Sequence, residues 1–151
     1  MKSAIGLNTR AYFGTGGIVY GVISNAHYFT LIFYSQVLGL APGLAGMALA
    51  IGLVIDAVTD PLVGYLSDNT RSRLGRRHPY LYASIIPLAA AYFFLWHPPL
   101  TLQGDWELFV WLLVVNASLR FCTTLFLIPA YALLAEITSD YEERTRLLTV
   151  Y

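Results

Sequence analysis

Charged residues and cysteine are both scarce in this sequence. Asp, Glu, Lys and Arg make up only 12% of the residues, about half the share that soluble domains carry. Acidic and basic residues balance to a formal net charge of zero, so the total charge indicates no nucleic-acid partner. The single cysteine, Cys122, lies in an apolar run and cannot form an intrachain disulfide, which favours a small buried hydrophobe. The composition therefore excludes an ordinary soluble domain and a disulfide-linked scaffold.

Apolar residues are abundant instead, at 57% of the chain, and they occur in long runs. A helix needs about 20 residues to cross the hydrocarbon core of a bilayer. Four segments come close to this length, at about residues 12–37, 44–66, 80–96 and 108–134. The sequence, which has the length of one domain, thus predicts an all-α membrane protein with four transmembrane helices in a lipid bilayer.

Basic residues are concentrated on one side of the predicted membrane. Eight of the nine lie in the N-terminal tail, in the loop between the second and third spans, or in the C-terminal tail: Lys2, Arg10, Arg71, Arg73, Arg76, Arg77, Arg144 and Arg146. The other two loops, residues 35–43 and 97–107, contain no Lys or Arg. Because positively charged loops stay in the cytoplasm, we expect both ends of the chain on the cytoplasmic side of an inner membrane.

Three ionisable residues fall inside the predicted spans, where a charge is expensive and marks a candidate functional site. Asp56 and Asp60 are four residues apart and so share one face of the second span. Two carboxylates this close repel unless one is protonated or a cation lies between them. We therefore predict a site for a coupling ion, sodium or a proton, with hydroxyl oxygens from Thr59 and Thr124. The alternative is that Arg120, in the fourth span, neutralises one aspartate across a helix interface.

Polar residues of the first span suggest a cavity beside this site. His27, near Asn25, either faces such a cavity or is a hydrogen-bonded packing residue. Glycines of the second span, including Gly52 and Gly64, predict close approach of neighbouring helices, because small residues let backbones pack tightly in lipid.

The loop after the second span carries a motif. Residues 60–79 read DPLVGYLSDNTRSRLGRRHP, which resembles the loop signature of the major facilitator superfamily. The signature positions are Gly64, Asp68, Arg73, Gly75, Arg76 and Arg77. Its longer form, together with IPAYALLAE at 128–136 and DYEERTR at 140–146, resembles the glycoside–pentoside–hexuronide:cation symporters, the melibiose permease family.

This resemblance implies a fold and a function. The chain would form part of the N-terminal six-helix bundle of a twelve-span transporter that couples sodium or proton entry to uptake of a sugar-like solute by alternating access. The signature residues would form a charge latch between the two halves of the transporter, and its ion pairs would break and re-form during transport. The alternative is that the basic residues only set the membrane topology. Four spans are too few for this cycle, so we expect a fragment or truncated product, inactive without the remaining spans, and with no cofactor besides the coupling ion.

The sequence also departs from the family. Val19 and Leu127 stand where sugar-transporting members carry carboxylates that hold sugar hydroxyls. The cation-site positions, by contrast, are matched by Asp56, Asp60 and Thr124. The resemblance thus favours ion coupling over sugar recognition, and it leaves open an apolar, amphipathic or anionic substrate with Arg120 as counter-charge.

Two other functions are alternatives to transport. A membrane-embedded, metal-dependent phosphotransferase would use Asp56, Asp60 and Asp68 at helical spacing. Such enzymes need a glycine after the second aspartate and acids on the next helix. Here Pro61 follows, and the third span has no acid, so we do not expect an enzyme. A non-transporting membrane scaffold derived from a truncated transporter is favoured only by the length of the chain.

Overall fold

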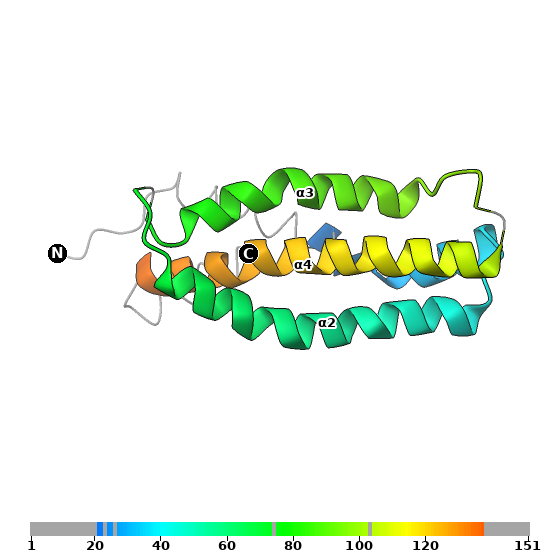
Figure 1. Ribbon diagram of the computed structural model, residues 1–151, viewed down its shortest axis with the longest axis horizontal. Coiled ribbons are helices and arrows are strands. Elements are labelled where there is room, and N and C mark those ends of the chain that lie inside the picture. The colour runs from blue at the N-terminus through cyan, green and yellow to red at the C-terminus, as the bar shows by residue number, and fades with distance from the viewer. Residues whose placement is uncertain (1–20, 23, 26, 74, 103, 138–151) are drawn as a thin grey trace.

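The structure is a computed structural model that describes residues 21–137 except 23, 26, 74 and 103 (Figure 1). The described residues between 21 and 32 are helical and lead into a π-helical turn, η1 (Phe33–Val37). Three α-helices follow: α2 (Pro42–Asn69), α3 (His78–Trp96) and α4 (Asp105–Ile137). Within the described residues, these three are long and apolar enough to cross a membrane. The helices predicted at 44–66, 80–96 and 108–134 are therefore confirmed, whereas the predicted first span lies partly outside the described residues.

Proline and acidic residues set where the helices begin. Pro42 and Pro79 lie in the first turns of α2 and α3, where a missing backbone N–H leaves no helical hydrogen bond unmade. Asp105 and Glu107 lie in the first turn of α4, where a negative charge interacts favourably with the helix dipole. Each helix therefore begins slightly before the apolar run that predicted it.

The helices pack as a bundle with α4 against both α2 and α3 (Figure 1). Successive helices run in opposite directions, so α2 and α4 are parallel to each other and α3 is antiparallel to both (Figure 1). The buried apolar cluster includes Tyr34, Leu40, Leu95, Leu112 and Leu119. The Tyr34 hydroxyl donates a hydrogen bond to the backbone oxygen of Leu95 at 2.9 Å, which joins the first helical segment to the end of α3.

Parallel packing brings residues of α2 and α4 together at four-residue intervals. The Asn116 side-chain nitrogen donates to the backbone oxygen of Ala48 at 3.3 Å. One turn further along α4 and two turns further along α2, Arg120 contacts Asp56, and one more turn along both helices Thr124 contacts Asp60. At the far end, a Cβ added to Gly64 would meet Ile128 at 3.7 Å, an ordinary packing distance. This register carries the polar residues of the candidate site.

Candidate functional site

The two carboxylates of α2 have different partners on α4. Arg120 donates from Nη1 to Oδ2 of Asp56, and the two form a partly buried ion pair. Asp60 accepts a hydrogen bond from the Thr124 hydroxyl at 2.8 Å. Within the described part of the chain, Asp60 forms no ion pair. The interface alternative predicted for Arg120 is thus observed at Asp56, whereas Asp60 is balanced only by a neutral hydroxyl.

Gly52 makes room for Arg120. A Cβ at this position would lie 2.7 Å from both Cδ and Nε of Arg120 and would also collide with the Asn116 amide. Real side chains do not approach this closely, so a glycine is required for Arg120 to cross α2 and reach Asp56. Asn116 fixes the same crossing, because its hydrogen bond to Ala48 holds the two helices together one turn away. The prediction that Gly52 marks a close helix approach is confirmed.

A cavity of about 400 Å³ opens beside these pairs. It is lined by Ser24, His27, Tyr28, Asp56, Asp60, Arg120, Thr123, Thr124, Leu127, Ile128 and Tyr131. The first helical segment, α2 and α4 all contribute. The cavity brings together the predicted ion-site residues Asp56, Asp60 and Thr124 and the predicted cavity residues His27, Arg120 and Leu127.

Sequence reasoning missed several lining residues of this cavity. Thr123, Ile128 and Tyr131 were not singled out, although helical spacing indicates two of them. Ile128 is four residues after Thr124, and Tyr131 is four residues after Leu127, so each shares a face with a predicted residue.

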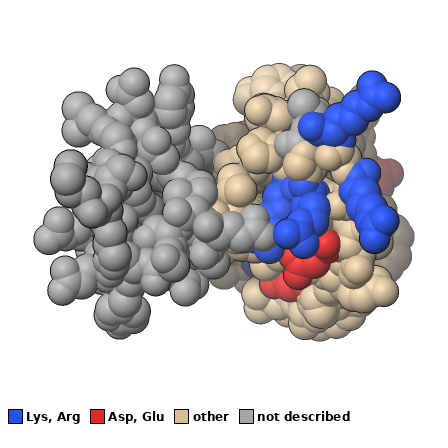
Figure 2. Space-filling model, turned by 90° about the vertical axis from the view of Figure 1, so that its left-hand side faces the viewer, with Lys and Arg blue, Asp and Glu red and all other residues tan. Residues whose placement is uncertain are grey.

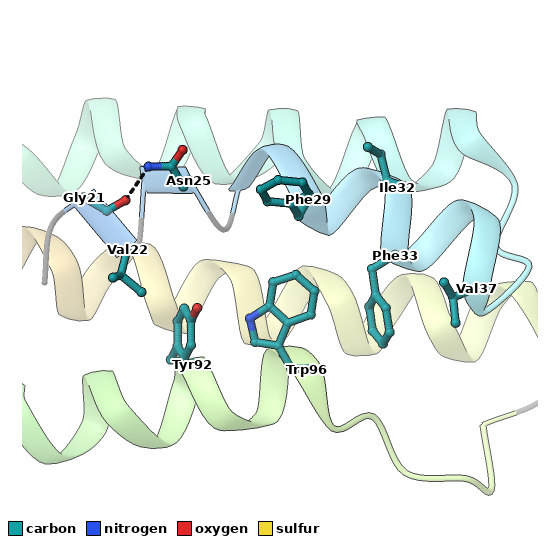
Figure 3. A pocket seen from close by; sticks show the side chains of 9 residues that line it. All are labelled: Gly21, Val22, Asn25, Phe29, Ile32, Phe33, Val37, Tyr92 and Trp96. Carbon is teal, nitrogen blue, oxygen red and sulfur yellow. Dashed lines mark hydrogen bonds between the residues drawn. The ribbon is translucent and has the colours of Figure 1, made fainter. Parts of the chain in front are cut away.

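Two predicted residues lie elsewhere, and a third is not described. Asn25 lines a separate cavity of about 750 Å³ between the first helical segment and α3, where its side chain donates to the Gly21 oxygen at 2.7 Å (Figure 3). Two residues along a helix rotate the side chain by about 200°, so Asn25 and His27 point in opposite directions. Thr59 is not among the lining residues, and its hydroxyl donates at 3.5 Å to the backbone oxygen of Asp56. Val19 lies outside the described residues.

The separate cavity is apolar. Phe33 and Trp96 form one of its walls, with ring centroids 5.2 Å apart (Figure 3). Asn25 is therefore a helix-bonded amide at the edge of an apolar surface, which corrects its assignment to the cavity that contains His27.

The predicted latch residues lie at the end of the bundle where α2 leads into α3. Arg77 donates from Nη2 to Oδ1 of Asp68 at 3.0 Å. The hydroxyls of Thr70 and Tyr80 are 2.6 Å apart and join the same two helices. Gly75 has a φ of +98°, a left-handed conformation that side chains rarely adopt. The expected cationic partner of Asp68 is confirmed, while the remaining predicted latch residues Arg73 and Arg76 are exposed.

The acidic residues that the structure describes do not form a multi-carboxylate metal centre. Among the described residues, no three His, Cys, Asp or Glu side chains converge on one point. Asp68 pairs with Arg77 rather than with the other acids of α2. A cation at Asp56 and Asp60 would therefore need hydroxyl or backbone oxygens as further ligands, a donor set suited to sodium rather than to zinc.

Known proteins match this chain closely. The family model described as MFS/sugar transport protein matches residues 12–151. The chain is 38% identical to an uncharacterized symporter of Synechocystis sp., covering 92% of this chain and 26% of that protein. It is 34% identical to sodium-dependent lysophosphatidylcholine symporter 1-A of Danio rerio (95% and 27%). It is also 34% identical to the putative glycoside/cation symporter YagG of Escherichia coli (95% and 30%). The chain spans less than a third of the length of each of these relatives.

Proposed function

Because this chain belongs to the MFS/sugar transport protein family, and with it to the glycoside–pentoside–hexuronide:cation symporters of the major facilitator superfamily, we propose that it forms part of a secondary transporter. The transporter couples the downhill entry of a cation to the movement of a small solute by alternating access. The symporter names of its relatives support cation coupling. In this proposal the loop between α2 and α3 and both ends of the chain face the cytoplasm, as their arginines favour.

The observation that carries the proposal is the charge balance of the cavity. Two carboxylates, Asp56 and Asp60, face one guanidinium, Arg120, so the three groups together carry one negative charge. An unbalanced charge inside a membrane span is expensive. One monovalent cation at Asp60 would neutralise the site, with the Thr124 oxygen as a further ligand. Sodium and a proton both meet this requirement, and the sodium-dependent relative supports sodium.

Arg120 links the cation to the solute in this proposal. A cation shared by both carboxylates competes with Arg120 for Asp56. Once released from Asp56, the guanidinium can form bidentate hydrogen bonds with an anionic group of the solute. Cation binding and solute binding then favour each other, as symport requires.

The lining of the cavity favours an amphipathic solute with an anionic or zwitterionic group. Leu127, Ile128, Tyr28 and Tyr131 supply apolar and aromatic surface, and Arg120 supplies positive charge. A lysophosphatidylcholine symporter among the relatives supports this class. A sugar-like solute is the second candidate, supported by the family description and by the glycoside/cation relative.

Uptake into proteoliposomes tests cation coupling. With the purified complete transporter of which this chain is part, and a radiolabelled solute of each candidate class, we expect accumulation when an inward sodium or proton gradient is imposed. Ionophores that collapse the driving gradient should reduce accumulation to equilibration. Concentrative uptake with both gradients collapsed, or equilibration alone under every gradient, would contradict the proposal.

Competition tests the substrate class. Neutral sugars, uronates and lysophospholipids are added as unlabelled competitors during uptake. Arg120→Gln should raise the Ki of anionic competitors by roughly ten- to a hundredfold, the value of a hydrogen bond to a charged group. Arg120→Lys, which keeps the charge, should raise it less. Inhibition by neutral sugars alone, with a Ki unaffected by Arg120→Gln, would rule out the anion-binding role.

A further inference from the structure

Four arginines gather at the end of the molecule that carries the loop between α2 and α3. Arg71, Arg73, Arg76 and Arg77 lie within seven consecutive residues. Figure 2 shows basic side chains spread over this end, beside a small acidic patch. Arg77 among them forms an ion pair with Asp68.

The arginines line an open hollow in the surface at this end of the molecule. The cavity has a volume of about 680 Å³ and is lined by the four arginines together with His78 and Leu133, among others. None of its described lining residues is acidic. A water molecule occupies about 30 Å³ in the liquid, so the space accommodates a polar group far larger than solvent.

The two arginines nearest α2 are available to a ligand. Arg71 and Arg73 are exposed, and neither forms an ion pair within the described part of the chain. Helix α3 begins at His78, so the positive end of its dipole points toward the same cavity. Guanidinium groups form bidentate hydrogen bonds with phosphate oxygens. Fixed positive charge from several directions thus converges on a space that holds no described negative group.

The position of the hollow favours a lipid headgroup over a soluble phosphate as its ligand. Leu133, on α4, supplies an apolar wall, and the arginines lie where the apolar helix α2 has just ended. A lipid headgroup at this depth would place its phosphate among the arginines and its acyl chains beside the helices. A soluble phosphate would gain nothing from the apolar wall.

We propose that this arginine cavity binds the phosphate headgroup of an anionic membrane lipid. The contact is independent of the solute cavity, which lies between the first helical segment, α2 and α4. The lipid site goes beyond the proposed transport function. A lipid bound there would contact the loop in which Asp68 and Arg77 join α2 to α3.

Native mass spectrometry of the detergent-solubilised protein, titrated with phosphatidylglycerol or phosphatidylcholine, tests the proposal. Both lipids carry a phosphate, but only phosphatidylglycerol carries a net negative charge. We expect phosphatidylglycerol to bind at least about tenfold more tightly. The double variant Arg71→Gln/Arg73→Gln should weaken its binding by roughly tenfold or more, as expected for two arginines near an anionic surface. Because both residues are exposed, these variants should fold normally.

Two further measurements distinguish a specific lipid-binding site from nonspecific electrostatic attraction and from a site for a soluble phosphate. Arg71→Lys/Arg73→Lys keeps the positive charge but removes the planar guanidinium groups that bind phosphate bidentately. Its affinity for phosphatidylglycerol should therefore fall between those of wild type and the glutamine variant. Glycerol phosphate should compete only weakly. Equal affinity for the two lipids, no effect of the glutamine substitutions, or glycerol phosphate binding as tightly as phosphatidylglycerol would each overturn the proposal.

Discussion

At the scale of single residues, Gly52 determines whether the ion pair of Arg120 and Asp56 exists. The guanidinium stem lies across α2 where a Cβ would come within 2.7 Å of it. The same Cβ would collide with the Asn116 amide, so two side chains of α4 would have to move to make room for it. A glycine, which has no side-chain chemistry of its own, therefore positions the Arg120 guanidinium.

Substitution of Gly52 tests this positioning role. Gly52→Ala should displace Arg120 and lower the free energy of unfolding by about 1–3 kcal/mol, the usual cost of overpacking. It should also reduce the maximal rate of cation-driven uptake about tenfold. Thermal unfolding and proteoliposome uptake measure the two effects.

Gly46→Ala is the matched control, because a Cβ at Gly46 meets nothing within 4 Å among the described residues. Alanine there should leave uptake unchanged and leave stability equal or slightly higher. Equal behaviour of the two variants would show that Gly52 is an ordinary helix glycine.

At the scale of elements, the end of α2 and the start of α3 form a joint. Arg77 has a side chain only 12% exposed, but that of Asp68 is 60% exposed, so water screens the pair. Exposed ion pairs contribute about 0.2–1 kcal/mol. An energy of this size would bias a two-state equilibrium without locking it, as a latch in this loop requires, and the latch stays a prediction.

Charge substitutions at the joint test the latch. Asp68→Asn or Arg77→Gln should slow uptake by about 1.5- to 5-fold, as this range of energies implies, while the Kd of the solute stays the same. The swap Asp68→Arg/Arg77→Asp should recover much of the lost rate. Loss of solute affinity at unchanged turnover would contradict the latch and favour a purely topological role.

Helix positions could be predicted because apolar runs and their proline and glycine borders are local features. The long α4 continues through Pro129 without ending, since neighbouring helices stabilise proline-containing spans. Which carboxylate meets which partner was not predictable. Arg120 and Thr124 are one turn apart, as are Asp56 and Asp60, so a slip of one turn between the helices would pair Arg120 with Asp60, or Thr124 with Asp56, instead. The register depends on Gly52 and on the contact of Asn116 with Ala48, which are visible only in three dimensions.

At the scale of the whole molecule, large apolar side chains cover much of the outside. Ile86 on α3 is 78% exposed and Val54 on α2 is 64% exposed. In water, surface of this kind would drive aggregation. In a bilayer this apolar surface contacts lipid chains or further transmembrane helices. The polar residues between α2 and α4 differ from this apolar surface. The proposed function gives them a role, which is to bind the coupling cation and the solute.

The central claim is that Asp60 holds the coupling cation. The most direct test is solute accumulation by wild type and Asp60→Asn proteoliposomes under the driving gradient, with Asp105→Asn as the control for an exposed carboxylate at the start of α4. Asp60→Asn should equilibrate solute across the membrane without concentrating it, while wild type and Asp105→Asn concentrate it equally. Concentrative uptake by Asp60→Asn at the wild-type level would contradict the account.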